Sequence, residues 1–473
     1  MIKQKRYLLL LLFLGLFSAC NTKETQPPNI IFILTDDQGY GDLGVYGATD
    51  INTPHLDELA ASGAYFTSYY ATQPVCSASR ASILTGCYSD RVNIHNAFGP
   101  NSKRGINPKE TTLAEMLQNE GYKTAIFGKW HLGDAPKFLP TRHGFDEFFG
   151  ILYSNDMWPK HPQQGTVFNF PDIYLYENET PLRVLEEQSF LTGALTDKAI
   201  DFISRNKAEP FFLYLPHPQP HVPLFADGKF HGQSNRGLYG DVITEIDHSV
   251  GRIVKTLKEN GLFENTMIVF TSDNGPWLSY GGHSGSPGKF REGKGTNWEG
   301  GHRVPGIVHY PNAILPNTVI DAPAMGMDWL PTIAEVTQSK LPELKIDGKS
   351  LLPLLKGTTE LSPHDNFFFY YRTNELHAVR HKDWKLYVPH SYRSLNGRTG
   401  TNDGNPISYD QNKIEVSELY DLKTDPEENT NLADQFPEIV FKISKIADSV
   451  RVVLGDQLKG IKGNEVRQAG QIN

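Results

Sequence analysis

The 473-residue chain has few cysteines, and it has no long basic tract after its first residues. Its three cysteines, Cys20, Cys76 and Cys87, are too few for a disulfide framework, so the fold must rely on its hydrophobic core. The formal net charge is -9, which argues against nucleic acid as a partner. No internal repeat is present. The length allows one large domain with a smaller companion.

The N-terminus has the features of an export signal. A positive segment at residues 3–6 precedes an apolar stretch at residues 7–17, which is too short to span a bilayer comfortably as a permanent helix. The sequence Phe-Ser-Ala-Cys that follows, ending at Cys20, resembles a bacterial lipobox. We predict a lipoprotein signal peptide over residues 1–19 and a polar tether over residues 20–28. The protein would be exported and anchored to a membrane by lipid on Cys20, in the periplasm or on the outer-membrane surface. An ordinary signal peptide with an incidental cysteine is the alternative.

Residues 29–360 alternate between short apolar runs and amphipathic segments. Four runs are typical of buried parallel strands: Asn29–Leu34, Thr124–Phe127, Pro210–Leu215 and Thr266–Phe270. Helices are predicted at Thr53–Ser62, after the capping box Thr112–Glu115, and at Tyr239–Asn260. This alternation predicts an α/β domain with a mostly parallel central sheet sandwiched by helices.

The composition changes after about residue 360, and residues 361–473 are predicted to form a smaller α+β subdomain. Antiparallel strands are expected at Asn366–Tyr371, Ala378–Val379, Trp384–Tyr387 and near Glu418–Tyr420. A polar loop, Leu395–Pro406, precedes the last of these strands. A helix over roughly Glu438–Leu458 is expected to close the subdomain.

Polar clusters directly follow the four predicted parallel strands. In chain order they are Asp36-Asp37, Lys129-Trp130-His131, the pair His217 and His221, and Asp273-Asn274. In open α/β sheets, ligands bind in the crevice beyond the carboxyl ends of the strands. A single cluster of this kind is often only a surface loop. Four at equivalent positions indicate a functional site.

Asp36, Asp37, Asp273 and Asn274 all offer oxygen atoms as ligands. Oxygen ligands without cysteine or histidine select calcium or magnesium rather than zinc. Three carboxylates at one point would also repel one another unless a dication neutralised them. The alternative is that Asp36 or Asp273 acts only as a helix cap or turn residue.

Cys76 begins a run of small residues that ends at Gly86 and fits a short helix. A group at the N-terminus of this helix lies at the positive end of its dipole. Arg80 follows four residues later, so its side chain can lie on the same face of the helix. Taken alone, this position suggests an acidified thiol nucleophile.

Cys76-Ser77-Ala78-Ser79-Arg80, with Thr85-Gly86 behind it, resembles the C-x-(P/A)-x-R signature of type I sulfatases, members of the alkaline-phosphatase-like superfamily. Further segments resemble the same family, and together they extend over nearly the whole mature chain. They are NIIFILTDDQG (29–39), GKWHLG (128–133), TSDNG (271–275), GKG and WEGG (293–301), and ELYDL with its downstream DP and NL pairs (418–432).

The resemblance implies that a separate maturation enzyme oxidises Cys76 to formylglycine, whose gem-diol attacks the sulfur of a sulfate ester. It also implies one calcium ion, held by Asp36, Asp37, Asp273, Asn274 and the modified Cys76. Arg80 would orient the modified residue, and Lys129 and Lys294 would neutralise the sulfuryl oxygens. Further roles are implied for three residues: His131 as the base that expels sulfate, His221 as the acid for the leaving alcohol, and Ser154 as a sulfate contact.

We therefore predict an exo-acting sulfatase that removes sulfate from the chain ends of a sulfated saccharide. The segments around Ser154 and Trp298 resemble arylsulfatase A and galactosamine-sulfate sulfatases, which favours a galacto-configured sugar. One alternative is a formylglycine-dependent phosphonate monoester hydrolase or phosphodiesterase. A second is a lipoprotein that binds sulfated glycans without cleaving them, although binding alone does not require this set of reactive groups.

Overall fold

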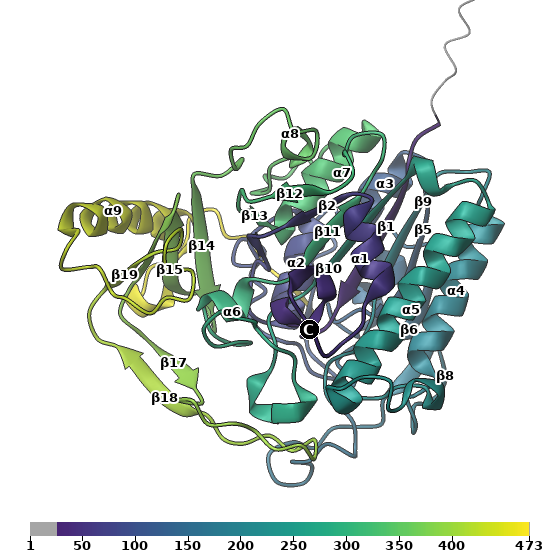
Figure 1. The fold of residues 1–473 in the computed structure, drawn as a ribbon, viewed down its shortest axis with the longest axis horizontal. Helices are drawn as coiled ribbons and strands as arrows, with labels where there is room; N and C mark the ends of the chain where they lie inside the picture. The colour runs from purple at the N-terminus through teal and green to yellow at the C-terminus, as the bar shows by residue number, and fades with distance from the viewer. Residues whose placement is uncertain (1–25, 473) are drawn as a thin grey trace, which may run out of the picture.

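The computed structural model describes residues 26–472, so the predicted signal peptide and the lipid site at Cys20 lie outside the described residues. Its largest element is a ten-stranded sheet with helices on both faces (Figure 1). Across the sheet the strands are β12 (Thr318–Ile320), β2 (Ala64–Phe66), β11 (Gly306–His309), β10 (Thr266–Ser272), β1 (Asn29–Thr35), β9 (Phe211–Pro216), β5 (Lys123–Lys129), β6 (Glu147–Ile151), β7 (Tyr174–Glu177) and β8 (Thr180–Val184).

The centre of this sheet is parallel. Strands β10, β1, β9, β5 and β6 run in the same direction, whereas β11, β7 and β8 add antiparallel pairings towards the two edges. Strands β1, β9 and β10 are buried along their whole length, which explains their continuous apolar sequences. The predicted fold class is confirmed.

Alternate side chains of β1 enter two separate hydrophobic cores, as the pleat of a strand requires. Ile30, Phe32 and Leu34 face one core, which α2 (Cys76–Thr85), α3 (Leu113–Asn119) and α7 (Trp329–Thr337) complete. Ile31 and Ile33 face the other, beneath α1 (Pro54–Ala61), α4 (Leu191–Arg205) and α5 (Gly237–Glu259). Among residues 26–472, no helix is both long enough and apolar enough to cross a membrane.

The C-terminal part contains a smaller antiparallel sheet, which lies beside the large one (Figure 1). Its strands are β14 (Asn366–Tyr371), β15 (Glu375–His381), β16 (Trp384–Tyr387) and β19 (Glu418–Asp421), and they share a core with α9 (Pro437–Leu454). The helix predicted to reach Leu458 ends at Leu454, because Gly455 adopts a φ of 87° that stops it. A separate hairpin, β17 (His390–Ser394) and β18 (Asp410–Ile414), flanks the predicted polar loop.

A buried ion network joins the C-terminal sheet to α6 (Glu299–His302). The Lys385 ammonium, on β16, lies 2.9 Å from a carboxylate oxygen of Glu299 and 3.1 Å from one of Glu428, and all three side chains are fully buried. Burial alone would raise the pKa of Glu299, but Lys385 and Arg303 lower it to about 2. Glu299 is therefore ionised, and Lys385 is one of the charges that compensate it.

Replacing Lys385 with methionine is expected to lower the free energy of unfolding by about 3–5 kcal/mol, because it leaves buried carboxylates without their shared cation. Thermal or urea unfolding measures the change. Lys413→Met is the matched control, since Lys413 and its partner Glu415 are exposed, and it should cost less than about 1 kcal/mol. Equal stability of the two variants would contradict the role given to Lys385.

Candidate active site

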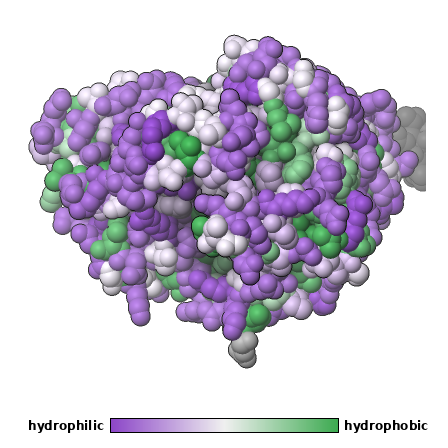
Figure 2. Space-filling view, turned by 90° about the horizontal axis from the view of Figure 1, so that it is seen from below, coloured by the Kyte–Doolittle hydropathy of each residue, from purple (hydrophilic) through white to green (hydrophobic). Residues whose placement is uncertain are grey.

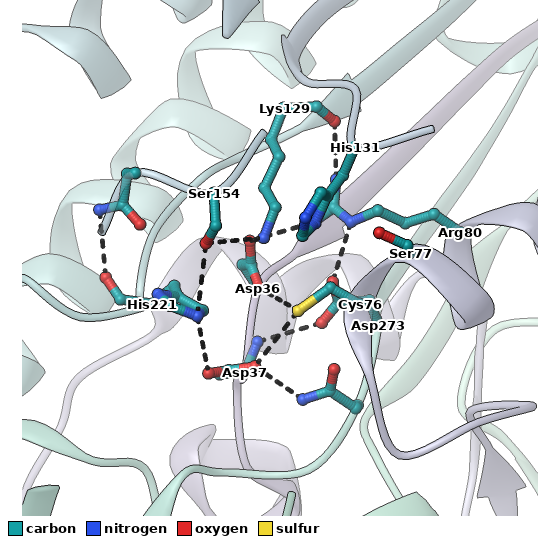
Figure 3. Close-up of polar contacts among 12 residues, drawn as sticks. Asp36, Asp37, Cys76, Ser77, Arg80, Lys129, His131, Ser154, His221 and Asp273 are labelled. Carbon is teal, nitrogen blue, oxygen red and sulfur yellow. Dashed lines mark hydrogen bonds and ion pairs between the residues drawn. The ribbon is translucent and has the colours of Figure 1, made fainter. Parts of the chain in front are cut away.

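The carboxyl ends of the central strands bring the predicted polar clusters together at one edge of the sheet. Asp36 and Asp37 follow β1, Lys129 ends β5, and Asp273 follows β10. Figure 2 looks onto this edge and shows a hollow near the centre of the face. Figure 3 shows that these side chains point toward Cys76 at the start of α2.

Cys76 lies within contact distance of both acidic and basic groups. Its Sγ is 3.3 Å from Asp36 Oδ1 and 3.4 Å from Lys294 Nζ. Burial, followed by the negative charge of Asp36, raises the pKa of the Cys76 thiol well above its usual value. The expectation of an acidified thiol at this helix start is therefore wrong. An unmodified cysteine here would stay protonated and would be a poor nucleophile.

Arg80 is a buried side chain that contacts Asp36, Asp273 and the backbone of Lys129. Its side chain is fully buried, with Nε 2.9 Å from Asp273 Oδ2 and Nη2 3.3 Å from Asp36 Oδ2. Its Nη1 donates to the backbone carbonyl of Lys129 at 2.7 Å. As the spacing from Cys76 predicts, the guanidinium lies on the same side of α2 as the site, where it positions two carboxylates and the end of β5 (Figure 3).

The four predicted metal ligands form an oxygen-rich group that fits a hard dication. Asp37 Oδ1 lies 2.7 Å from Asn274 Nδ2, and the backbone amide of Asp37 donates to Asp273 Oδ1 at 3.2 Å. The other amide atom, Asn274 Oδ1, is buried without a partner among residues 26–472. Burial, followed by the charge of Asp36, raises the pKa of Asp273 to about 6. A cation would relieve this repulsion and give the unpartnered oxygen a ligand role.

One further group of ligand atoms differs from the predicted set. Single ligand atoms of Asp36, Asp37, Cys76 and His221 all lie within 4.8 Å of one another. Asp273 is not in that group, and its Oδ2 accepts a hydrogen bond from Arg80 Nε at 2.9 Å. Oxygen atoms, including the amide of Asn274, still dominate the donors, so the chemistry favours calcium or magnesium over zinc.

Two lysines and a serine line the rest of the pocket. Lys129 Nζ forms an ion pair with Asp36 and donates to Ser154 Oγ at 3.1 Å. Lys294 Nζ contacts Asp37 Oδ1 at 2.7 Å. Burial alone would lower the pKa of Lys294, but the charge of Asp37 raises it well above its usual value. Both lysines are buried cations, suited to a multiply charged anion.

His131 has one ring nitrogen that makes no hydrogen bond to the described part of the chain. Its Nε2 donates to the carbonyl of Phe98 at 2.8 Å, so in the neutral ring Nδ1 carries a lone pair. That Nδ1 is buried and has no partner within residues 26–472. Burial, with the charges of Lys129 and Arg80, lowers the pKa of His131 well below its usual value. The ring is therefore neutral and can accept a proton.

His221 has the opposite arrangement, with its reactive nitrogen turned toward the acidic groups. Its Nδ1 donates to the Val222 carbonyl at 2.5 Å. Nε2 lies 3.5 Å from Asp37 Oδ2 and 3.4 Å from Ser154 Oγ. This nitrogen therefore faces the pocket, where it can give a proton to a bound group.

Backbone strain is concentrated at two of these residues. Asp37 has a φ of 64° and His131 a φ of 63°, both in the left-handed region that residues other than glycine rarely adopt. Such conformations persist where surrounding contacts enforce them, and they cluster at functional sites. Here they turn the chain sharply after β1 and β5, so that the side chains enter the pocket.

The sequence did not predict the contribution of the C-terminal part to this site. Arg393, on β17, donates to the backbone carbonyl of Lys294 and so fixes the segment that carries that lysine.

Trp277 also lines the site: its ring lies 5.5 Å from the His221 ring, centroid to centroid, and 4.5 Å from Lys294 Nζ. In the sequence, the only sign of a role for Trp277 in the site was its position after the Asp273-Asn274 pair.

Two other histidines have no direct part in this arrangement. His302 is buried and bonded through both ring nitrogens, to the Ala71 carbonyl at 2.7 Å and to Asn297 at 2.6 Å, which makes it a core residue. His217 is buried, with no hydrogen-bond partner for either nitrogen among residues 26–472, and burial lowers its pKa to about 4.

Family models match most of the chain. Residues 28–339 match the model described as sulfatase, residues 362–464 match the C-terminal region of aryl-sulfatase, and residues 293–396 match the C-terminal region of N-sulphoglucosamine sulphohydrolase. The first two matches together include every residue placed in the pocket above.

Among curated proteins, arylsulfatase A of Bos taurus is 37% identical over 448 residues, covering 90% of this chain and 87% of the relative. N-acetylgalactosamine-6-sulfatase of Mus musculus is 40% identical over 403 residues, covering 81% and 76%. Among solved structures, the PsFucS1 sulfatase from Pseudoalteromonas sp. aligns with a TM-score of 0.80 at 28% identity, covering 91% of each chain. The protein Ps i-CgsB, solved with k-i-k-neocarrahexaose, aligns with a TM-score of 0.75 at 28% identity, covering 90% and 92%.

Proposed function

The chain belongs to the sulfatase family, as a type I member of the alkaline-phosphatase-like superfamily, and from this premise we propose that it removes sulfate from a saccharide. It is a sulfuric ester hydrolase. The observation that carries the proposal is the environment of Cys76, which lies among buried carboxylates and ammonium groups yet cannot ionise readily. Such a position suits a residue that acts after modification.

Calcium and a formylglycine derived from Cys76 complete the proposed site. Asp36, Asp37, Asp273 and Asn274, together with residue 76, would hold the ion. When bound, calcium supplies Lewis-acid polarisation of a sulfate oxygen. The aldehyde hydrate supplies a hydroxyl nucleophile and a second hydroxyl through which the enzyme can be regenerated. A maturation enzyme acting on Cys76 is part of this proposal.

The chain's own charges hold the sulfuryl group. Lys129 and Lys294 place ammonium groups on two sides of the Cys76 side chain, and Ser154 adds a hydroxyl beside Lys129. These groups are fixed before substrate binds, which is the arrangement that stabilises developing negative charge most effectively. Arg80 forms ion pairs with the carboxylates of Asp36 and Asp273 rather than contacting the substrate, so it holds these carboxylates in position.

Two histidines divide the proton transfers. His221, whose Nε2 lies 3.5 Å from Asp37 Oδ2, would give a proton to the leaving alcohol oxygen. His131 is neutral, and its Nδ1 lone pair can accept the proton released when sulfate is expelled. An acid and a base acting in one pocket each need a ring nitrogen that faces the substrate.

Replacing His221 with glutamine is expected to lower kcat/KM by about 10²–10⁴-fold on sugar sulfates, whose leaving alcohols need a proton. The loss should be smaller on 4-nitrophenyl sulfate, because its phenolate leaves readily without one. Steady-state kinetics on both substrates measures the difference. Equal losses on the two substrates would contradict a general-acid role.

The saccharide assignment is supported by the relatives, since one is named for N-acetylgalactosamine 6-sulfate and another was solved with an oligosaccharide. Within that class we favour a galacto-configured sugar. The test is release of inorganic sulfate from a panel of 2-, 3-, 4- and 6-sulfated mono- and disaccharides. Activity on galacto-configured members is expected, and inactivity on all of them would overturn that preference.

A parallel assay separates the nearest alternative chemistry. A formylglycine phosphonate hydrolase would share the nucleophile, so an aryl sulfate and an aryl phosphonate should be compared at equal concentration. The sulfate should be hydrolysed faster. A dominant phosphonate activity would contradict the proposed reaction.

We also propose that the protein is exported and anchored by lipid on Cys20. The lipobox-like sequence and the short apolar stretch before it support this proposal. Residues 20–28 would act as a tether, residues 29–360 as the catalytic domain and residues 361–473 as its smaller companion. Display in the periplasm or on the outer-membrane surface would bring the site to its glycan.

A further inference from the structure

Asp156 is a buried carboxylate close to the sulfate pocket that the catalytic scheme does not use. Its side chain is only 10% exposed. It lies two residues after Ser154, whose hydroxyl contacts Lys129. Two residues of extended chain span at most about 7 Å. The backbone of Asp156 therefore lies within the reach of a sugar ring whose sulfate occupies the pocket.

The hydrogen-bonding capacity of this carboxylate is largely unused. Asp156 Oδ1 is buried and accepts no hydrogen bond from any residue in the range 26–472. Its other oxygen lies 3.9 Å from Nε2 of His161, beyond hydrogen-bond distance. Buried carboxylates in folded proteins normally accept hydrogen bonds through both oxygens. The open oxygen thus points to a ligand that brings its own donor.

The surroundings of Asp156 connect it to the catalytic acid. Burial, followed by the charge of Asp156, raises the pKa of Tyr280, whereas Lys294 opposes the increase. Tyr280 packs against Trp277 at 5.0 Å, and Trp277 in turn lies 5.5 Å from His221. Asn155, the residue before Asp156, donates to the His221 carbonyl at 3.4 Å, so the segment that carries Asp156 lies against the catalytic acid.

The neighbouring residue anchors the same segment. Asn155 Nδ2 donates to the Pro223 carbonyl at 3.2 Å, and its own carbonyl accepts from Gln188 at 3.2 Å. The segment from Ser154 to Asp156 is thereby held against the loop that carries His221. A carboxylate on such a braced segment is preorganised, which is what selective recognition requires.

We propose that Asp156 accepts a hydrogen bond from a free hydroxyl of the substrate that neighbours the sulfated position on the sugar. This assignment rests on the proposed saccharide sulfatase function. It makes Asp156 a specificity-determining residue. A second sulfate at the neighbouring position would bring like charges together and would be rejected, whereas a hydroxyl would satisfy the buried oxygen.

The test compares each enzyme with itself on two substrates. Asp156→Asn and Asp156→Ala should lower the ratio of kcat/KM on the preferred sugar sulfate to kcat/KM on 4-nitrophenyl sulfate by roughly 10- to 100-fold, the range for a hydrogen bond to a charged group. Because the ratio cancels the fraction of active enzyme, partial misfolding does not mimic the effect. Asp172→Asn is the control, since Asp172 is exposed in a nearby segment, and it should leave the ratio unchanged.

A substrate analogue lacking the neighbouring hydroxyl gives an independent readout. Wild-type enzyme should discriminate against the deoxy analogue, and Asp156→Asn should lose most of that discrimination. An unchanged ratio in both Asp156 variants, or undiminished discrimination in Asp156→Asn, would overturn the assignment while leaving the sulfatase function intact. A wild-type enzyme that cleaves 4-nitrophenyl sulfate but no sugar in the panel would overturn both this assignment and the saccharide function.

Discussion

Replacing Cys76 with alanine is expected to abolish sulfate release, with kcat/KM falling by roughly 10⁴-fold or more, the scale on which loss of a nucleophile acts in other covalent hydrolases. The substitution removes the side chain that Lys294 and Asp36 surround, and neither neighbour can replace it as a nucleophile toward sulfur. Cys76→Ser should also be nearly inactive in a host whose maturation enzyme oxidises only cysteine. Release of inorganic sulfate from 4-nitrophenyl sulfate measures the loss.

Cys87→Ala is the matched control for this substitution. Cys87 is also buried, but it contacts Arg467 rather than any group in the pocket. Its replacement should leave kcat/KM within about threefold, a small effect on the scale of about 1.4 kcal/mol for each factor of ten. Near-normal activity of Cys76→Ala would contradict the nucleophile assignment, whatever the outcome for Cys87.

Removing the bound metal with EGTA is expected to lower kcat/KM by roughly 10²–10³-fold, because a Lewis acid contributes several kcal/mol at about 1.4 kcal/mol per factor of ten. Thermal stability should fall as well, since an ion that binds only the folded state stabilises it. Without a cation, Asp273 remains buried beside the negatively charged Asp36, an arrangement that raises its pKa to about 6. Activity assays and thermal unfolding on one preparation measure both effects.

Adding metals back distinguishes the proposed ion from its competitors. Calcium should restore both activity and thermal stability, and zinc should not, because the ligands are mostly oxygen atoms. Asp273→Asn should weaken the restoration by calcium and so connect the effect to this site. Full activity after exhaustive chelation, with no loss of thermal stability, would contradict a resident metal ion.

The central strands were the easiest part of the fold to predict. Strands β1, β9 and β10 are buried on both faces, so their sequences are continuously apolar and stand out from the helices between them. Helix α7 escaped prediction because Pro331 resembles a helix breaker, although it lies in the first turn, where proline is tolerated. Helix α4 has Thr192 and Gly193, which have low helix propensity, in its first turn, and its stability comes from packing on the sheet.

Much of the candidate site could also be predicted, because its residues follow strands whose ends meet at one edge of the sheet. Asp36, Lys129 and Asp273 come from distant parts of the sequence, and strand order alone brings them together. The state of the Cys76 thiol could not be predicted in this way. The helix dipole suggested acidification, but burial and the charge of Asp36 outweigh it.

Contributions from tertiary packing were not visible in the sequence. Arg393 reaches the backbone of Lys294 from the C-terminal hairpin, and no local pattern marks that contact. Asp156 Oδ1 is recognised as unpartnered only because no donor among residues 26–472 reaches it in the fold. Such features depend on which side chains meet across the pocket, so they require coordinates rather than motifs.

Mass spectrometry of the peptide containing Cys76, from active protein purified from its native host, tests the central claim most directly. The proposed mechanism predicts a peptide in which an aldehyde or its hydrate replaces the thiol at residue 76, in an amount that rises and falls with sulfatase activity across preparations. Fully active protein whose Cys76 peptide carries only the unmodified thiol would contradict it.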